Sequence, residues 1–197
     1  MLKVALTGGI ATGKSYVLDQ LRKRGVPCLD ADELAHGVTA AGTEATAAIA
    51  ARFGADMIAA DGAVDRAKLG PLVFADATAR HDLEAIVHPA IYRAVAAGLR
   101  AFELTGEYPI AVVDIPLLYE TGRAKDFDRV IATTCAPAIQ LARLRERGLS
   151  EEAARQRLAA QLSSAEKAAR ADVVITTDGT FEETDRQIAT IVEDLRR

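Results

Sequence analysis

Five short apolar runs in the sequence predict five β-strands. They cover residues 2–7, 26–29, 110–114, 129–134 and 172–176. Between these runs, apolar residues recur at helical spacing, as in Val17, Leu18 and Leu21 after the first run. Strands that alternate with helices are typical of an α/β fold with a parallel sheet. We therefore expect an open parallel sheet, in which ligands bind at the carboxyl ends of the strands.

A long helical pattern separates the second strand from the third. Residues 39–104 are helical in character, with expected breaks at Gly42, Gly54, Gly62 and Gly70–Pro71. His88–Pro89 is predicted to open a further helix, with Pro89 at its first position, so His88 is a capping or locally hydrogen-bonded residue rather than a catalyst. A single crossover helix needs far fewer residues, so we expect a separate helical lobe.

The sequence Gly8-x-x-x-x-Gly13-Lys14-Ser15 lies between the first strand and the helix that follows. This is the P-loop pattern, in which backbone N–H groups surround a polyphosphate, the lysine reaches the outer phosphates and the hydroxyl binds Mg²⁺. The alternative is a glycine-rich turn with a solvated lysine. The strand before it and the helix after it favour phosphate binding.

Carboxylates follow two of the predicted strands. Asp30 and Asp32 come at the end of the second strand, on the rim expected to carry the P-loop. One of them is suited to accept a proton from an alcohol, and the other to cap the helix at residues 33–38. Asp114 closes the third strand, where it either holds a metal through water or bonds to the turn at residues 115–116.

The stretch from residue 138 to 171 is rich in arginine. Ser150 and Ser163 are predicted to cap two helices, the second with Glu166 in a capping box. Cations on a helical hairpin beside an anion site are typical of a closing lid, although interleaved glutamates also fit an ordinary charged surface. Arg147, directly before Gly148, is the candidate for phosphate contact.

The composition is that of a globular protein. The 197 residues are 50% hydrophobic and carry a formal net charge of -4, so neither disorder nor a nucleic-acid or membrane surface is indicated. No signal peptide or membrane span is expected, because a strand begins at residue 2. Cys28 and Cys135 lack metal-ligand spacing and are expected to be buried thiols in a reducing cytoplasm.

With these features placed, the chain resembles the dephospho-coenzyme A kinase family of the P-loop nucleoside-kinase-like group. The resemblance runs nearly end to end. Its motifs are LTGGIATGKS at Leu6–Ser15, GVPCLDADELAH at Gly25–His36, LEAIVHPAI at Leu83–Ile91, DIPLLYE at Asp114–Glu120 and QLSSAEKAARAD at residues 161–172. The DAD, HP and PLLYE motifs are far more specific than the P-loop alone.

The resemblance implies a single P-loop kinase unit with a five-stranded parallel sheet in the order 2-3-1-4-5. The core would comprise about residues 1–35, 108–136 and 172–197, the acceptor-binding helical lobe 36–107, and the lid 137–171. It implies ATP as donor, with Mg²⁺, and the ribose 3′-hydroxyl of dephospho-coenzyme A as acceptor, giving coenzyme A and ADP in the last step of its synthesis. We expect a cytoplasmic monomer or small homo-oligomer without nucleic-acid or membrane partners.

The resemblance also assigns roles to particular residues. Asp32 is the expected general base, assisted in catalysis by Lys14 and the lid residue Arg147. The residues expected around the ATP phosphates are Gly8, Gly9, Ala11, Thr12, Gly13, Lys14, Ser15 and Tyr16. Ser15 and Asp114 are the expected metal ligands, and Asp30 and His88 are weaker candidates for substrate binding.

Three positions depart from the family pattern. Ala11–Thr12 replaces the usual Gly-Ser, and an alanine forced to positive φ at residue 11 costs about 1 kcal/mol. Tyr16 replaces a usual threonine, which matters little if the contact to ATP uses the backbone N–H. Thr177 stands where asparagine is frequent, which puts the adenine-side contact there in doubt.

Two other functions fit parts of the pattern. A kinase of the same group acting on another small molecule or a nucleotide would share the P-loop, and a panel of acceptors would distinguish it. A regulatory NTPase switch would also contain a P-loop, but the sequence has no Asn/Thr-Lys-x-Asp motif for reading guanine. The large helical lobe also suits an acceptor better than an effector loop.

Overall fold

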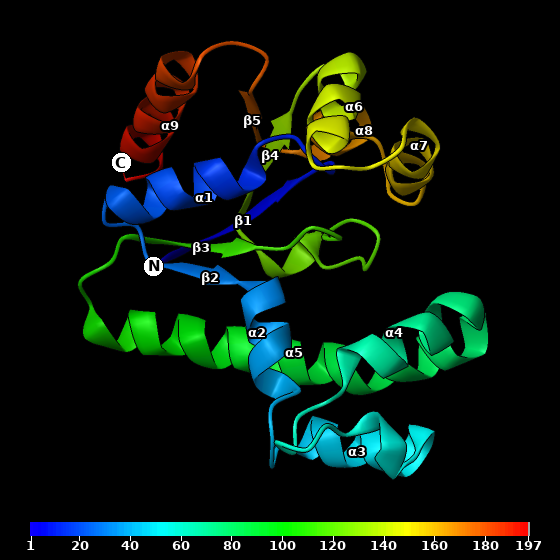
Figure 1. Ribbon diagram of the computed structural model, residues 1–197. Coiled ribbons are helices and arrows are strands. Elements are labelled where there is room, and N and C mark those ends of the chain that lie inside the picture. Colours follow the sequence, from blue (N-terminus) through cyan, green and yellow to red (C-terminus); the bar gives the residue numbers. More distant parts are fainter. Residues whose placement is uncertain (197) are drawn as a thin grey trace. The chain divides into compact units, whose positions relative to one another are not determined.

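The computed structural model describes residues 1–196 and contains a five-stranded sheet in the order β2-β3-β1-β4-β5 (Figure 1). The strands are β1 (Leu2–Gly8), β2 (Cys28–Asp30), β3 (Ile110–Asp114), β4 (Arg129–Thr134) and β5 (Val173–Thr176). β1 pairs in parallel with both β3 and β4, and β4 pairs in parallel with β5. The predicted fold class and strand order are confirmed.

The chain divides into two compact units. One comprises Met1–Leu29 and the chain from Ala101, and the other is Asp30–Arg100. The first unit contains the sheet with α1 (Lys14–Lys23), α6 (Pro137–Glu146), α7 (Glu151–Ala159), α8 (Ser164–Arg170), α9 (Phe181–Leu195) and the 3₁₀ turn η2 (Ala124–Asp126). The second contains α2 (Ala31–Val38), α3 (Glu44–Phe53), the 3₁₀ turn η1 (Ala55–Met57), α4 (Arg66–Ala75) and most of α5 (Ala77–Thr105). The functional division into core, lobe and lid stays a prediction.

The central strands are apolar because they are buried on both faces. Val4, Ala5 and Leu6 of β1 are completely buried, and every residue of β3 is buried. Continuous apolar runs of this kind are typical of parallel sheets covered by helices. α1 and α9 lie side by side in Figure 1, and their apolar faces share a core cluster with β1. This packing fixes the position at which β1 ends and α1 begins.

Two predicted helix breaks are wrong. α4 continues through Gly70–Pro71, and α5 continues through His88–Pro89. α5 instead begins after Asp76, whose carboxylate accepts hydrogen bonds from the N–H groups of Thr78 (2.7 Å) and Ala79 (3.3 Å). A proline inside a helix forfeits one backbone hydrogen bond, but side chains of α5 are buried on both sides of Pro89. Tertiary packing therefore maintains one helix where local sequence indicated two.

The other three predicted breaks in the helical lobe and the two serine caps are confirmed. Gly42, Gly54 and Gly62 all have positive φ and lie outside the helices. The Ser150 hydroxyl accepts a hydrogen bond from the Ala153 N–H, and Ser163 and Glu166 form the predicted capping box. Although α5 has 29 residues, no helix among residues 1–196 is both long enough and apolar enough to cross a membrane.

Both cysteines are free thiols, with Cys135 buried and Cys28 half-buried. Burial raises the pKa of the Cys28 thiol to about 12 and also raises the pKa of Cys135. Both side chains are therefore protonated at neutral pH and act as small apolar groups.

Candidate active site

The loop between β1 and α1 adopts a conformation that only certain residues tolerate. Gly13 has φ 79° and precedes the first turn of α1, and Ala11 has φ 60°. Ala11 is the single non-glycine residue with positive φ among residues 1–196, and it is one of the three positions that depart from the family pattern. Its side chain packs in a small cluster with Leu144 and Ala154, which offsets part of the left-handed strain of about 1–2 kcal/mol.

Two glycines of the loop leave no room for a side chain. A Cβ at Gly8 would lie 2.0 Å from Thr133 Oγ1, and one at Gly9 would lie 2.9 Å from Gln140 Nε2. Thr12 is buried below the loop, where its hydroxyl donates to the Gly9 carbonyl (2.8 Å) and lies 2.7 Å from Thr133 Oγ1. The Thr12 side chain therefore supports the loop from inside rather than facing a ligand.

The N-terminus of α1 is open. The helix follows Gly13, which has no side chain to cap it, and no acidic residue lies in its first turn. In contrast, α2, α3, α4, α7, α8 and α9 all have a side-chain cap. The first N–H groups of a helix have no partner within it, so those of Lys14, Ser15 and Tyr16 are suited to an anion.

Lys14 and Asp114 form an ion pair between Lys14 Nζ and Asp114 Oδ2. The two side chains are only 16% and 2% exposed. Asp114 ends β3, the neighbour of β1 in the sheet, so its carboxylate reaches the lysine that follows the loop. The structure thus brings Asp114, the candidate metal ligand at the end of the third strand, to the P-loop lysine.

Arg143 and Thr177 secure the loop from the other side. Arg143 Nη1 donates to the Ala11 carbonyl (3.1 Å), and the Thr177 hydroxyl donates to the Thr12 carbonyl (2.9 Å). Sequence analysis missed the role of Arg143, because it is one of six arginines between residues 138 and 171 and helical periodicity does not distinguish it from the others. Its only sequence signal was its place on the predicted lid.

A cavity of about 440 Å³ lies beside the P-loop. It is lined by Gly13, Tyr16, Arg143, Arg147, Thr177, Gly179, Thr180, Phe181, Glu182 and Thr184. Arg147 directly follows α6 and is exposed, and its side chain forms no hydrogen bond or ion pair within residues 1–196. The structure therefore brings Arg147 together with two P-loop residues, Gly13 and Tyr16.

Asp30 and Asp32 have different surroundings in the second unit. Asp30 Oδ1 accepts from the N–H groups of Asp32 (2.8 Å) and Glu33 (3.2 Å), so Asp30 is the cap of α2. Asp32 is exposed, and its carboxylate forms no hydrogen bond or ion pair with the described part of the chain. Of the two aspartates, Asp32 is the one that is available to a ligand.

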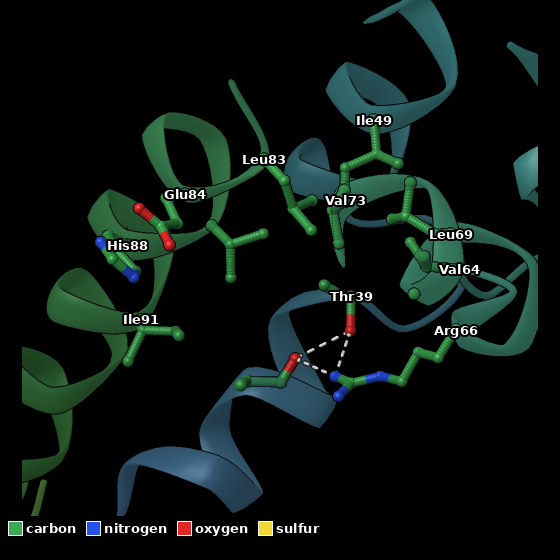
Figure 2. Close-up of a pocket in the computed structure, with 13 residues that line it drawn as sticks. Thr39, Ile49, Val64, Arg66, Leu69, Val73, Leu83, Glu84, His88 and Ile91 are labelled. Carbon is green, nitrogen blue, oxygen red and sulfur yellow. Dashed lines mark hydrogen bonds between the residues drawn. The ribbon is translucent and has the colours of Figure 1, made fainter. Parts of the chain in front are cut away.

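A second cavity, of about 350 Å³, lies among the helices of the Asp30–Arg100 unit (Figure 2). Its lining is mostly aliphatic and includes Val64, Leu69, Val73, Leu83 and Ile91, with His88 and Glu84 along α5. Figure 2 shows Arg66 held in place, as its Nη2 donates to the Ala35 carbonyl (2.8 Å) and to Thr39 Oγ1 (2.9 Å). His88 lies mid-helix, so the prediction that it precedes a helix start is wrong, but it does line a cavity.

Comparison with known proteins identifies the family. The family model for dephospho-CoA kinase matches residues 2–183. The chain belongs to the dephospho-CoA kinase family. A dephospho-CoA kinase of Geobacillus kaustophilus is 45% identical over 193 residues, covering 98% of this chain and 96% of that protein. The sequence-based assignment to this family is confirmed.

Solved structures agree with this assignment. The dephospho-CoA kinase from Campylobacter jejuni has a TM-score of 0.76 and 25% identity, covering 98% of this chain and 96% of its own. TT1252 from Thermus thermophilus has a TM-score of 0.80 and 32% identity, covering 98% and 97% of the two chains. The dephospho-CoA kinase fold therefore extends over almost the whole chain.

Proposed function

We propose that this enzyme transfers the γ-phosphoryl group of ATP to the ribose 3′-hydroxyl of dephospho-CoA, giving CoA and ADP. The observation that carries the proposal is the uncapped N-terminus of α1, with Lys14 beside Asp114, in a chain of the dephospho-CoA kinase family. An anion-binding helix end is the donor half of a phosphoryl-transfer site.

The phosphates of ATP occupy the loop from Gly8 to Tyr16. Its backbone N–H groups hold the phosphate oxygens, and Lys14 supplies a mobile positive charge to the transferring group. Arg147 adds a second cation from the proposed lid, since it lines the cavity next to Gly13. Closure of the lid over residues 137–171 excludes water from the reaction.

Ser15 and Asp114 are the proposed protein ligands of Mg²⁺. Both offer oxygen, the donor atom that this cation prefers. Among residues 1–196, no group of three or more His, Cys, Asp or Glu side chains is arranged to hold a metal ion. Phosphate oxygens and water would therefore complete the coordination, as is usual for Mg²⁺ at kinase sites. The bound ion would neutralise charge on the β- and γ-phosphates.

Asp32 is the proposed general base. Its carboxylate takes the proton of the 3′-hydroxyl as that oxygen bonds to the γ-phosphorus, while the bond from phosphorus to the β-phosphate oxygen breaks and ADP leaves. The proposal is supported by the exposed position of Asp32 and by the capping role that occupies Asp30. The Asp30–Arg100 unit binds the acceptor, and its aliphatic cavity is suited to an uncharged part of that molecule.

Product identification tests the proposal directly. The protein is mixed with ATP, Mg²⁺ and dephospho-CoA, and the products are separated by chromatography and identified by mass spectrometry. CoA and ADP in equal amounts are the expected result. Shikimate and nucleoside monophosphates serve as competing acceptors, and turnover of one of these without turnover of dephospho-CoA would refute the proposal. Light scattering on the same sample tests the prediction of a monomer or small homo-oligomer.

A further inference from the structure

An aromatic pair forms one wall of the cavity beside the P-loop. The rings of Tyr16 and Phe181 have centroids 4.7 Å apart and planes inclined at 43°. Both residues line the 440 Å³ cavity, together with Gly13 of the loop. Phe181 is 67% exposed, and it lines this cavity, so a face of its ring is accessible to a ligand there.

The pair is held in place by contacts behind it. The Tyr16 hydroxyl donates to Asp185 Oδ1 (2.9 Å), and Arg24 Nη2 lies 3.9 Å from the same oxygen. Phe181 is the first residue of α9, and the capping box of Thr180 and Glu183 fixes the backbone there. The two rings thus come from α1 and α9, whose packing against each other sets their separation.

Several polar side chains that line the cavity already bond to the protein. The Thr177 hydroxyl donates to the Thr12 carbonyl, and the Thr184 hydroxyl donates to the Thr180 carbonyl (3.2 Å). Arg143 is engaged with Ala11 and Thr177. The aromatic surface is therefore the prominent group that this wall offers to a flat ring.

We propose that the base of the nucleoside triphosphate donor stacks on Phe181, and that Tyr16 positions the Phe181 ring. The proposal depends on ATP being the donor, but not on which alcohol is phosphorylated. Gly13 belongs to both the phosphate loop and this cavity, so a nucleotide whose phosphates lie in the loop has its base on the cavity side. Stacking on an aromatic ring is tolerant of base identity because every base has a π-face.

Calorimetric titration of the full chain with two ligands tests the proposal. ATP carries a base, whereas inorganic tripolyphosphate occupies the loop without one. Phe181→Ala should weaken ATP binding by about 5- to 150-fold, the range of a lost stacking contact, and leave tripolyphosphate binding unchanged. Phe181→Tyr keeps a ring and should bind ATP within about twofold of the wild type.

Two further variants separate stacking from a general structural effect. Phe74→Ala removes a phenylalanine that is 92% exposed in the other unit and should change neither titration. Tyr16→Ala should weaken the binding of ATP but not of tripolyphosphate. The double variant should bind ATP little worse than Phe181→Ala does, because both substitutions act through the Phe181 ring. ATP binding that is unaffected by Phe181→Ala, or an equal loss for ATP and tripolyphosphate, would overturn the proposal. The titrations contain no acceptor, so their outcome does not depend on whether the enzyme phosphorylates dephospho-CoA.

Discussion

Arg143 forms two hydrogen bonds with Thr177: its Nη2 donates to the Thr177 carbonyl (2.7 Å) and its Nη1 donates to the Thr177 hydroxyl (3.1 Å). The same hydroxyl donates to the Thr12 carbonyl, so α6, the end of β5 and the P-loop form one hydrogen-bonded network. Thr177 occupies the position at which the family often has asparagine, and here its role is to support the loop.

Thr177→Val should expose this role, because it removes the hydroxyl and keeps the shape. The buried Thr12 carbonyl and Arg143 then each lose a partner, which we expect to cost about 1–3 kcal/mol of unfolding free energy. Thermal unfolding without ligand measures this loss. Thr177→Ser retains the hydroxyl and should be the milder change, and equal losses in the two variants would contradict the assigned network.

Asp32→Asn should lower kcat by roughly 100-fold or more, because an amide does not accept the acceptor's proton. The melting temperature should stay the same, since the Asp32 side chain is exposed. Steady-state rates with ATP and dephospho-CoA, alongside thermal unfolding, measure both effects. Unchanged turnover would remove Asp32 from the proposed role.

Asp30→Ala is the matched comparison for Asp32. It removes the cap of α2 and should cost about 1 kcal/mol of stability. Asp30→Asn preserves an acceptor oxygen and should restore most of that loss. A large loss of stability in Asp32→Asn, with none in Asp30→Ala, would reverse the two assignments.

Lys14→Met should abolish turnover and also destabilise the free protein. The substitution leaves the nearly buried Asp114 carboxylate without its lysine, which typically costs about 3–5 kcal/mol. Adding Asp114→Asn should recover stability, because no unpaired buried carboxylate then remains. It should not recover activity, because the positive charge of Lys14 is still missing. Denaturant unfolding of the four proteins gives the coupling between the two residues. Additive losses would show that the ion pair contributes little.

Glu120 and Lys167 make stability depend on pH. Lys167 is completely buried, and its Nζ donates to Glu120 Oε1 (2.9 Å) and to the Pro116 carbonyl (2.6 Å). Partial burial disfavours the Glu120 carboxylate, but the hydrogen bond and positive charge of Lys167, together with backbone hydrogen bonds that include the one from the Leu162 N–H, outweigh this effect and lower the pKa of Glu120 below its usual range. Because the folded-state pKa is lowered, the stabilisation is complete above the unfolded pKa of about 4.3 and is lost as the pH falls through the folded value.

Glu120→Gln should therefore lower the melting temperature strongly at pH 7 and progressively less below about pH 4. Lys167→Met is the matched variant. It should be less damaging at pH 7, because the Glu120 side chain is 22% exposed and water solvates it, whereas Lys167 has no access to water. Melting curves of the three proteins across pH 3–7 measure these effects. A difference that does not change with pH would argue against the ionised pair.

The sequence alone was sufficient to predict much of the local structure of this protein. The apolar runs specified five strands, and Gly8 to Ser15 specified a phosphate loop, because backbone freedom and helix-end chemistry are local properties that residue type controls. Ser163 and Glu166 specified a helix start for the same reason. Comparison with the family pattern singled out residue 11 as a place where a positive φ would strain an alanine, and the structure has a positive φ there.

Other features depended on contacts between distant residues. α5 continues through Pro89 because helix side chains on both sides of the proline are buried. Asp114 contacts Lys14 because β3 lies next to β1. Arg143 was indistinguishable from its neighbours until α6 was packed against the loop. The sequence by itself determined which local structures form and what chemistry they offer. Only the tertiary structure decided which side chains meet, because those contacts join residues far apart in the chain and no local pattern encodes them.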